Sequence, residues 1–101
     1  MPESKGVRIG GIIWLEAIVD KLDSKHHVAV EEVEEVLARA PGFRFIERGH
    51  RPGENVYAAF GKTQSGRRLL VFFVYKPRTH EALILSAREP SQRERKLYEK
   101  K

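Results

Sequence analysis

The sequence predicts an α+β fold: two N-terminal helices, a four-stranded and mainly antiparallel sheet, and a basic C-terminal helix. Three observations predict it. Apolar residues recur at helical spacing up to residue 39, they alternate at strand spacing over residues 43–87, and a helix start signal follows the last strand. Because helical and strand segments are segregated along the chain, an antiparallel sheet is favoured. The 101 residues fit one domain, which we place at residues 12–101 after a flexible terminus at 1–11.

Two helices are expected in the first 40 residues. Trp14, Ile18 and Leu22 recur every four residues and form the apolar stripe of a helix that runs to about Lys25. The segment Ile12-Ile13-Trp14, where this stripe begins, fits either a short edge strand or the entry to the helix. A second helix is expected over residues 30–39, where it ends at a Pro-Gly pair, because proline cannot continue a helix.

Four strands are expected next, over residues 43–48, 56–62, 68–76 and 82–87. The third strand is apolar on both faces, which predicts a central strand that is covered on both sides. The two N-terminal helices can cover one face of the sheet. The final helix offers only Leu97 and Tyr98 for the other face. We therefore expect another chain, either a second copy or a different protein, to cover part of that face.

The charges are segregated along the chain. Residues 1–40 carry 5 Lys and Arg against 8 Asp and Glu, whereas residues 41–101 carry 14 against 6, for a net charge of +5. A local positive field favours a polyanion such as RNA, although solubility alone also explains it. The absence of cysteine excludes disulfides, thiolate metal sites and cysteine nucleophiles. No apolar run is long enough for a membrane span and no secretory signal is present, so a cytoplasmic location is expected.

The start of the last helix is a candidate anion site. Ser91 and Glu94 have the spacing of a capping box, in which each side chain bonds the backbone amide of the other residue. Arg88 lies just before this helix start, whose free amides and positive dipole end attract anions. We expect Arg88 to hold a phosphate. The alternative is an ion pair between Arg88 and a carboxylate such as Glu94 or Asp20.

Lys25 and His26 are candidate catalytic residues at the end of the first helix. An imidazole transfers protons near neutral pH, and an ammonium group holds a phosphate oxygen. The alternative explanation is that the C-terminus of a helix favours cations without any ligand. His50 and Arg51 lie in a loop rich in Gly and Pro, where functional residues are common. His50 is the alternative to His26, and Arg51 is expected to assist at the phosphate, unless the pair simply forms a solvated turn.

Further cations follow on the last helix. Arg93, Arg95 and Lys96 are expected to bind RNA. The four histidines do not have the spacing of metal ligands, and no phosphate-binding or dinucleotide-binding glycine loop is present. No metal and no cofactor is therefore expected.

Several of these segments together resemble the BrnT family of toxins from type II toxin–antitoxin systems. The residues that carry the resemblance span about residues 12–100 and include Trp14, Lys25-His26, Gly53-Glu54, Tyr57, Gly66-Arg67, Ser86-Ala87-Arg88, Ser91, Glu94-Arg95 and Tyr98. The resemblance implies a RelE-like ribonuclease fold, cleavage of RNA and neutralisation by a cognate antitoxin. At the position after Lys-His it implies a glycine, and His27 suits that position if its backbone is left-handed.

The sequence differs from the family pattern where Leu15, Ile18, Leu22 and Val56 replace polar residues. Two main hypotheses follow. In the first, the protein is a metal-independent endoribonuclease. In the second, it is a non-catalytic module of the same fold that binds RNA or an antitoxin. A structural adapter that uses the acidic helix and the sheet is a third.

Overall fold

The computed structural model describes residues 7–40 and 42–99. In chain order its elements are β1 (Gly11–Ile13), α1 (Glu16–Lys21), the π-helix η1 (Leu22–His26), α2 (Val30–Arg39), β2 (Arg44–Arg48), β3 (Asn55–Lys62), β4 (Arg68–Lys76), β5 (Glu81–Arg88) and α3 (Gln92–Glu99). Among the described residues, no helix has the length and apolar character that crossing a bilayer requires.

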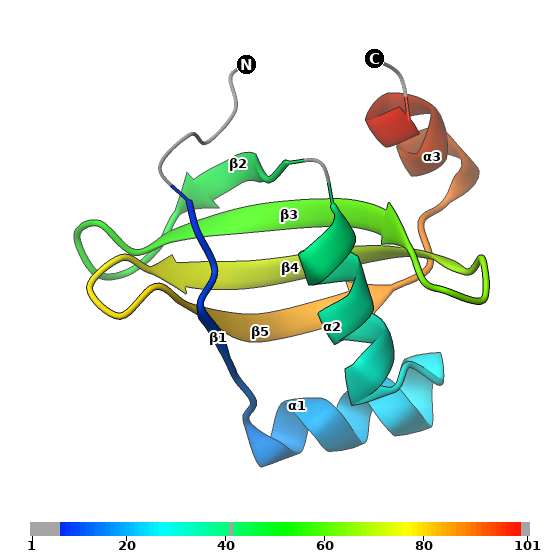
Figure 1. The fold of residues 1–101 in the computed structure, drawn as a ribbon, viewed down its shortest axis with the longest axis horizontal. Helices are drawn as coiled ribbons and strands as arrows, with labels where there is room; N and C mark the ends of the chain where they lie inside the picture. Colours follow the sequence, from blue (N-terminus) through cyan, green and yellow to red (C-terminus); the bar gives the residue numbers. More distant parts are fainter. Residues whose placement is uncertain (1–6, 41, 100–101) are drawn as a thin grey trace.

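One mixed sheet organises the molecule, in the order β1-β5-β4-β3-β2. Strands β2 to β5 are antiparallel neighbours, as the sequence predicts, and the α+β class is confirmed (Figure 1). A fifth strand joins the four that were predicted, because Gly11–Ile13 forms β1 and pairs in parallel with β5; this is the short edge strand that the sequence left open. A parallel pair needs a long crossover between its strands, and here all the elements from α1 to β4 lie between them.

The first helix begins later than predicted and changes its winding. Trp14 and Leu15 precede it, with Leu15 in an extended conformation, and α1 passes at Leu22 into the π-helix η1. Leu22 is buried, as the apolar stripe predicts. His27 ends η1 with a left-handed backbone, at φ 54°, which is the conformation that the glycine-like position requires. The second helix has the predicted bounds, and Pro41, the first residue of its predicted stop signal, lies outside the described residues.

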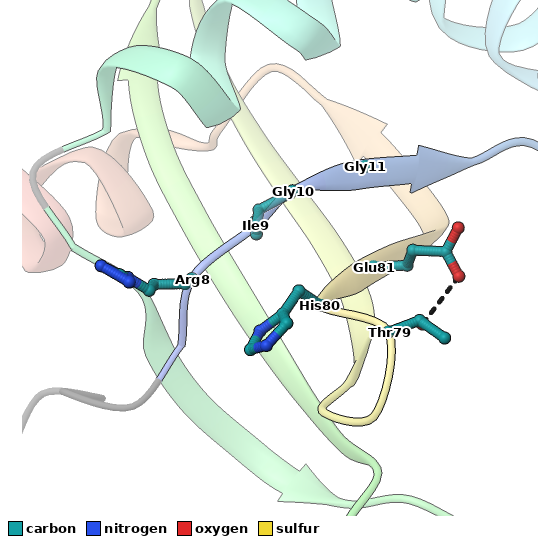
Figure 2. A pocket seen from close by; sticks show the side chains of 7 residues that line it. All are labelled: Arg8, Ile9, Gly10, Gly11, Thr79, His80 and Glu81. Atoms are coloured by element: carbon teal, nitrogen blue, oxygen red, sulfur yellow. Dashed lines mark hydrogen bonds between the residues drawn. The ribbon is translucent and has the colours of Figure 1, made fainter.

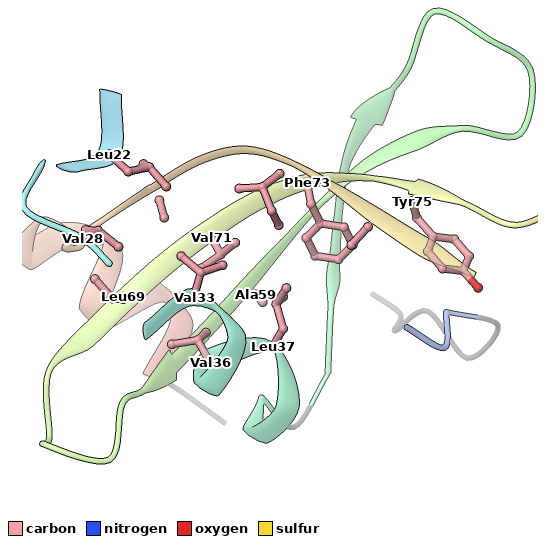
Figure 3. Close-up of a cluster of buried hydrophobic side chains, with 13 residues drawn as sticks. Leu22, Val28, Val33, Val36, Leu37, Ala59, Leu69, Val71, Phe73 and Tyr75 are labelled. Carbon is pink, nitrogen blue, oxygen red and sulfur yellow. The ribbon is translucent and has the colours of Figure 1, made fainter. Parts of the chain in front are cut away.

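The hydrophobic core lies between the helices and one face of the sheet (Figure 3). Its members are the buried apolar residues Leu22, Val28, Val33, Val36, Leu37, Ala59, Leu69, Val71, Phe73, Tyr75, Ala82, Ile84 and Ala87. Helix α2 packs closely on β3, because a Cβ at Gly61 would lie 3.4 Å from Cγ1 of Val36. This packing fixes the second half of α2 relative to the sheet.

The second face of the sheet is only partly covered. Tyr98 of α3 stacks on Phe60 of β3, with the ring centroids 5.9 Å apart, whereas Leu97 is 54% exposed. Val74 and Leu83 are paired on adjacent strands of this face and are half-buried. The prediction that the central strand is covered on both sides is therefore confirmed for the face under the helices, whereas the second face is covered only in part. Coverage of the rest by another chain stays a prediction.

The N-terminal segment contacts the sheet and the core from Val7 onward, the first residue that the structure describes. The backbone N–H of Arg8 donates to the hydroxyl of Tyr75 at 3.3 Å, and that hydroxyl donates to the Arg8 carbonyl at 3.0 Å. Val7 and Ile9 pack against the core. Residues 1–6 of the predicted flexible terminus, and residues 100–101 of the predicted domain, lie outside the described residues. The division of the chain at residue 11 stays a prediction.

Candidate functional site

Four segments of the chain meet at one end of the sheet. They are the end of η1, the hairpin between β3 and β4, the end of β5 and the start of α3 (Figure 1). Strand pairing places Arg88 opposite Leu70, close to the β3–β4 hairpin. Arg67, in that hairpin, bonds both the carbonyl of His26 and the carboxylate of Glu89. Arg67 therefore joins the segments around residues 26 and 89. The Arg88 side chain itself lies over Phe72 on the second face of the sheet, which α3 partly covers, and among the described residues no contact links it to Lys25 or His26.

Arg88 is held by a carboxylate. Its two terminal nitrogens donate to the two carboxylate oxygens of Glu94 at 2.7 and 2.8 Å, and its guanidinium carbon lies 5.7 Å from the centroid of the Phe72 ring. The hydrogen bonds that Arg88 donates to Glu94 raise the pKa of Arg88, although burial opposes this. Of the two carboxylates considered from the sequence, Glu94 is the partner of Arg88.

Glu94 also caps helix α3. Its carboxylate accepts from the backbone N–H of Ser91 at 2.9 Å, while the Ser91 hydroxyl accepts from the backbone N–H of Glu94 at 3.1 Å. The hydrogen bonds from Arg88 and then from the Ser91 amide lower the pKa of Glu94 to about 2. Glu94 is therefore ionised at neutral pH, so that its bonds to Arg88 and to the helix cap persist.

Lys25 and His26 end η1 with free side chains. Within residues 7–40 and 42–99, neither side chain has a hydrogen-bond or ion-pair partner. Lys25 is exposed and His26 is half-buried. An imidazole with both ring nitrogens available can accept or donate a proton to a bound molecule, and the adjacent ammonium group can attract an anion.

Arg67 is the residue at this end of the sheet to which the sequence assigned no role. Its guanidinium donates to the carbonyls of His26 and His27 at 3.1 and 2.8 Å, and to the carboxylates of Glu32 and Glu89 at 2.9 and 2.8 Å. Burial lowers the pKa of Arg67, but the bonds to these two carboxylates outweigh it and raise the pKa overall. The Gly66-Arg67 pair was visible in the sequence, but its partners are distant in the chain and carry no local signal.

The cations of α3 differ in how they are paired. Arg93 and Lys96 are exposed, and no ion pair holds either of them within the described residues. Arg95 lies 3.7 Å from the carboxylate of Glu99, and Arg68 of β4 pairs with the same carboxylate. Arg93 and Lys96 are thus the α3 cations most available to an anion.

His50 and Arg51 lie at the opposite end of the sheet. They precede Asn55, the first residue of β3, whereas Arg88 lies level with the last part of that strand. At about 3.3 Å per residue, β3 is roughly 25 Å long. His50 and Arg51 are therefore too far from Arg88 to act with it on one phosphate. A role for them in binding a distant part of an RNA stays a prediction.

A surface pocket of about 570 Å³ lies at that same far end, between the segment before β1 and the β4–β5 turn. Its charged residues do not converge, since Figure 2 shows Arg8 and Glu81 pointing in opposite directions. His80 turns its Nδ1 to the buried hydroxyl of Tyr75 at 2.8 Å. In the part of the chain that the structure describes, no three His, Asp or Glu side chains gather in a way that could hold a metal ion.

The class of protein that this fold and site define is an α+β domain with cationic side chains at one end of its sheet. No protein-family model matches the chain, and no curated protein matches it significantly. A solved structure does: the Brucella abortus ribonuclease toxin BrnT, with a TM-score of 0.57 and 19% sequence identity over 81% of this chain and 97% of that chain. The chain therefore has the fold of BrnT, as the sequence resemblance predicts.

Proposed function

We propose that this chain is a toxin of the BrnT kind, which cleaves RNA without a metal ion and is neutralised by a cognate antitoxin. The observation that supports it most is that Lys25 and His26, whose side chains have no partner among the described residues, lie at the end of the sheet where Arg88 also lies, on the other face. The fold shared with a ribonuclease toxin supports the same activity. RNA and an antitoxin are the partners proposed, and the cytoplasm is the proposed location.

The proposed reaction uses the RNA's own 2′-hydroxyl as the nucleophile. The 2′-oxygen loses its proton to a base and attacks the adjacent phosphorus, while the bond from phosphorus to the 5′-oxygen breaks and that oxygen gains a proton. The products are a 2′,3′-cyclic phosphate and a 5′-hydroxyl. We assign a proton transfer to His26, and stabilisation of the charge on the phosphate oxygens to Arg88 and Lys25. Arg93, Arg95 and Lys96 would hold the flanking RNA backbone.

The ion pair with Glu94 leaves Arg88 able to bind a phosphate. A guanidinium has five N–H donors, and Arg88 uses three of them, two toward Glu94 and one toward the Glu89 carbonyl at 3.5 Å. A phosphate that reaches Arg88 takes the remaining donors or displaces Glu94. If Glu94 stays in place, it orients the guanidinium of Arg88 and neutralises its charge. The long-range attraction of RNA then comes from the unpaired cations nearby.

Cleavage of RNA in the presence of EDTA tests the proposal. Two oligonucleotides of one sequence are used, one of ordinary RNA and one with 2′-O-methyl groups, which cannot supply the nucleophile. The proposal predicts that only ordinary RNA is cut, to fragments with 2′,3′-cyclic phosphate ends, and that EDTA leaves the rate unchanged. Equal cutting of both oligonucleotides, or cutting that EDTA stops, contradicts it.

The non-catalytic module remains a second candidate, because the pairing of Arg88 with Glu94 favours it. A module of this kind binds both oligonucleotides equally, with an affinity that falls steeply with salt, and cuts neither.

Neutralisation of this chain by an antitoxin is tested by expressing the chain with and without the product of the neighbouring gene. Growth arrest that the neighbour relieves supports a toxin, whereas normal growth in both cases argues against one.

A further inference from the structure

Arg67 joins three elements through one guanidinium. It lies in the β3–β4 hairpin, and its four hydrogen bonds reach the end of η1, the first turn of α2 and the residue after β5. Four of its five N–H donors are therefore used within the protein. Arg88, by contrast, keeps two donors free. Arg67 is thus poorly suited to bind a ligand and well suited to hold protein groups in place.

The backbone groups that Arg67 binds are those that a helix end leaves unpaired. The last carbonyls of a helix have no partner within it. Here the carbonyls of His26 and His27 both accept from the guanidinium of Arg67, at 3.1 and 2.8 Å. A planar guanidinium bound to two adjacent carbonyls fixes both the position and the direction of that backbone. The backbone of His26 is therefore held by a group outside its own helix.

The two carboxylates fix Arg67 in turn. Glu32 accepts from Arg67 and from the backbone N–H of Ala29, at the start of α2, so it ties the guanidinium to the helix. Glu89 follows Arg88 directly in sequence and accepts from the Nε of Arg67 at 2.8 Å. Arg67 is therefore bonded both to His26 and to Glu89, the residue that follows Arg88.

The hairpin itself presents Arg67 in this position. The hydroxyl of Thr63, which is buried, accepts from the backbone N–H of Arg67 at 3.1 Å. Gly66 has a φ of +95°, which favours glycine over any other residue. The backbone N–H of Gln64 donates to the carboxylate of Glu35 in α2 at 2.9 Å. Local hydrogen bonds and one glycine thus aim the Arg67 side chain toward η1.

We propose that Arg67 is the positioning residue that sets His26 relative to Arg88 for RNA cleavage. The inference rests on the proposed function, and it adds a residue that acts through another and does not itself touch the RNA. Replacement of Arg67 leaves His26 chemically intact but frees the end of η1. Displacement of a reacting group by about 1 Å can reduce a rate by about 10²-fold.

Arg67→Ala and Arg67→Lys test the proposal, with Arg68→Ala as the matched control. Arg68 is adjacent in sequence and is also ion-paired, but it pairs with Glu99 and does not bond η1. We expect Arg67→Ala to lower the single-turnover rate of cleavage by about 10- to 100-fold and Arg67→Lys to lower it less. We expect Arg68→Ala to leave the pH profile of cleavage unchanged. The salt dependence of RNA binding should be the same for Arg67→Ala and the wild type, since Arg67 neutralises no phosphate.

A second measurement separates this proposal from the proposed function. Nuclear magnetic resonance spectra of residues 26–28 need no RNA, so they are informative even if the protein cuts nothing. We expect Arg67→Ala, but not Arg68→Ala, to shift the ring signals of His26 at a fixed pH and the backbone amide signals of residues 26–28. Should Arg67→Ala fail to fold, Glu89→Gln weakens the same anchor and takes its place. Unchanged ring signals of His26 and unchanged backbone amide signals of residues 26–28 in the folded variant, or a reduced salt dependence of RNA binding, overturn the proposal.

Discussion

Glu94 is a single carboxylate that stabilises two features at once. It accepts from the Ser91 amide in the helix cap and from both terminal nitrogens of Arg88. Charge-assisted hydrogen bonds of this kind are stronger than neutral ones. The capping half is local, so the spacing of Ser91 and Glu94 was sufficient to predict it. The pairing with Arg88 depends on how α3 leaves β5, which the sequence left open between an ion pair and a phosphate site.

The lowered pKa of Glu94 makes stability depend on pH. Its pKa falls from the ordinary value of 4.5 to about 2 in the folded protein. A group whose folded pKa is lowered stabilises the protein fully above its unfolded pKa, and this contribution is lost as the pH falls toward the folded pKa. We therefore expect the free energy of unfolding to decrease between about pH 4.5 and pH 2.

Urea unfolding across this pH range checks the expectation, with Glu94→Gln for comparison. Glutamine keeps the length of the side chain and can still cap the helix, but it does not titrate. The wild type should exceed the variant by about 1 kcal/mol at pH 6, because the pair is partly open to solvent, and most of this difference should be lost as the pH falls to about 2. A constant difference from pH 6 to pH 2 would assign the stabilisation to another group.

At the scale of elements, the sequence predicted best where the signal is local and repeated. Helix α2 was predicted with its observed bounds, because its valines recur at helical spacing and its other face is acidic. Strand β1 was left ambiguous, because its three residues become a strand only by pairing with β5, about 70 residues later in the chain. The π-helix η1 was also missed, since the spacing of apolar residues does not distinguish its winding from that of an α-helix.

The docking of α3 on the second face of the sheet rests largely on one aromatic residue. Tyr98 stacks on Phe60, and the guanidinium carbon of Arg44 lies 5.0 Å from the centroid of the Tyr98 ring. We expect Tyr98→Ala to lower the free energy of unfolding by about 1–3 kcal/mol. Hydrogen exchange in α3 should become faster as well, because the helix loses its contact with β3.

Leu97→Ala is the matched control for this prediction. Leu97 is the next residue in sequence, and its side chain is largely exposed. We expect it to change the free energy of unfolding by less than about 0.5 kcal/mol. If Leu97→Ala proves as destabilising as Tyr98→Ala in the isolated protein, then α3 covers the sheet differently, or a second copy packs on it.

At the scale of the whole molecule, pairing of charges matters more than the net charge of +5. The sequence predicted a basic C-terminal half, but not which of its cations are neutralised by carboxylates. Arg67, Arg68 and Arg88 are all ion-paired at the candidate end of the sheet. The unpaired cations at this end determine how strongly a polyanion is attracted. Because the carboxylates that neutralise the other cations come from residues distant in sequence, composition alone could not show which cations are paired.

The free cations of α3 give a prediction about the affinity for RNA. Removal of Arg93 and Lys96 together should weaken binding to single-stranded RNA. It should also reduce the slope of log K against log salt concentration by about 1.4, since each phosphate contact contributes about 0.7. Fluorescence anisotropy at several salt concentrations measures this slope. A slope that does not change would place the RNA on another surface.

The catalytic claim depends on one imidazole, and the adjacent histidine provides its control. His27 is left-handed, so His27→Gly removes a neighbouring imidazole while it preserves the backbone. The deciding measurement is the single-turnover rate of RNA cleavage in EDTA by the wild type, His26→Ala and His27→Gly. We predict a loss of about 10²- to 10⁴-fold for His26→Ala and a change of less than about 3-fold for His27→Gly. A His26→Ala variant that cuts RNA as fast as the wild type would contradict the proposed site.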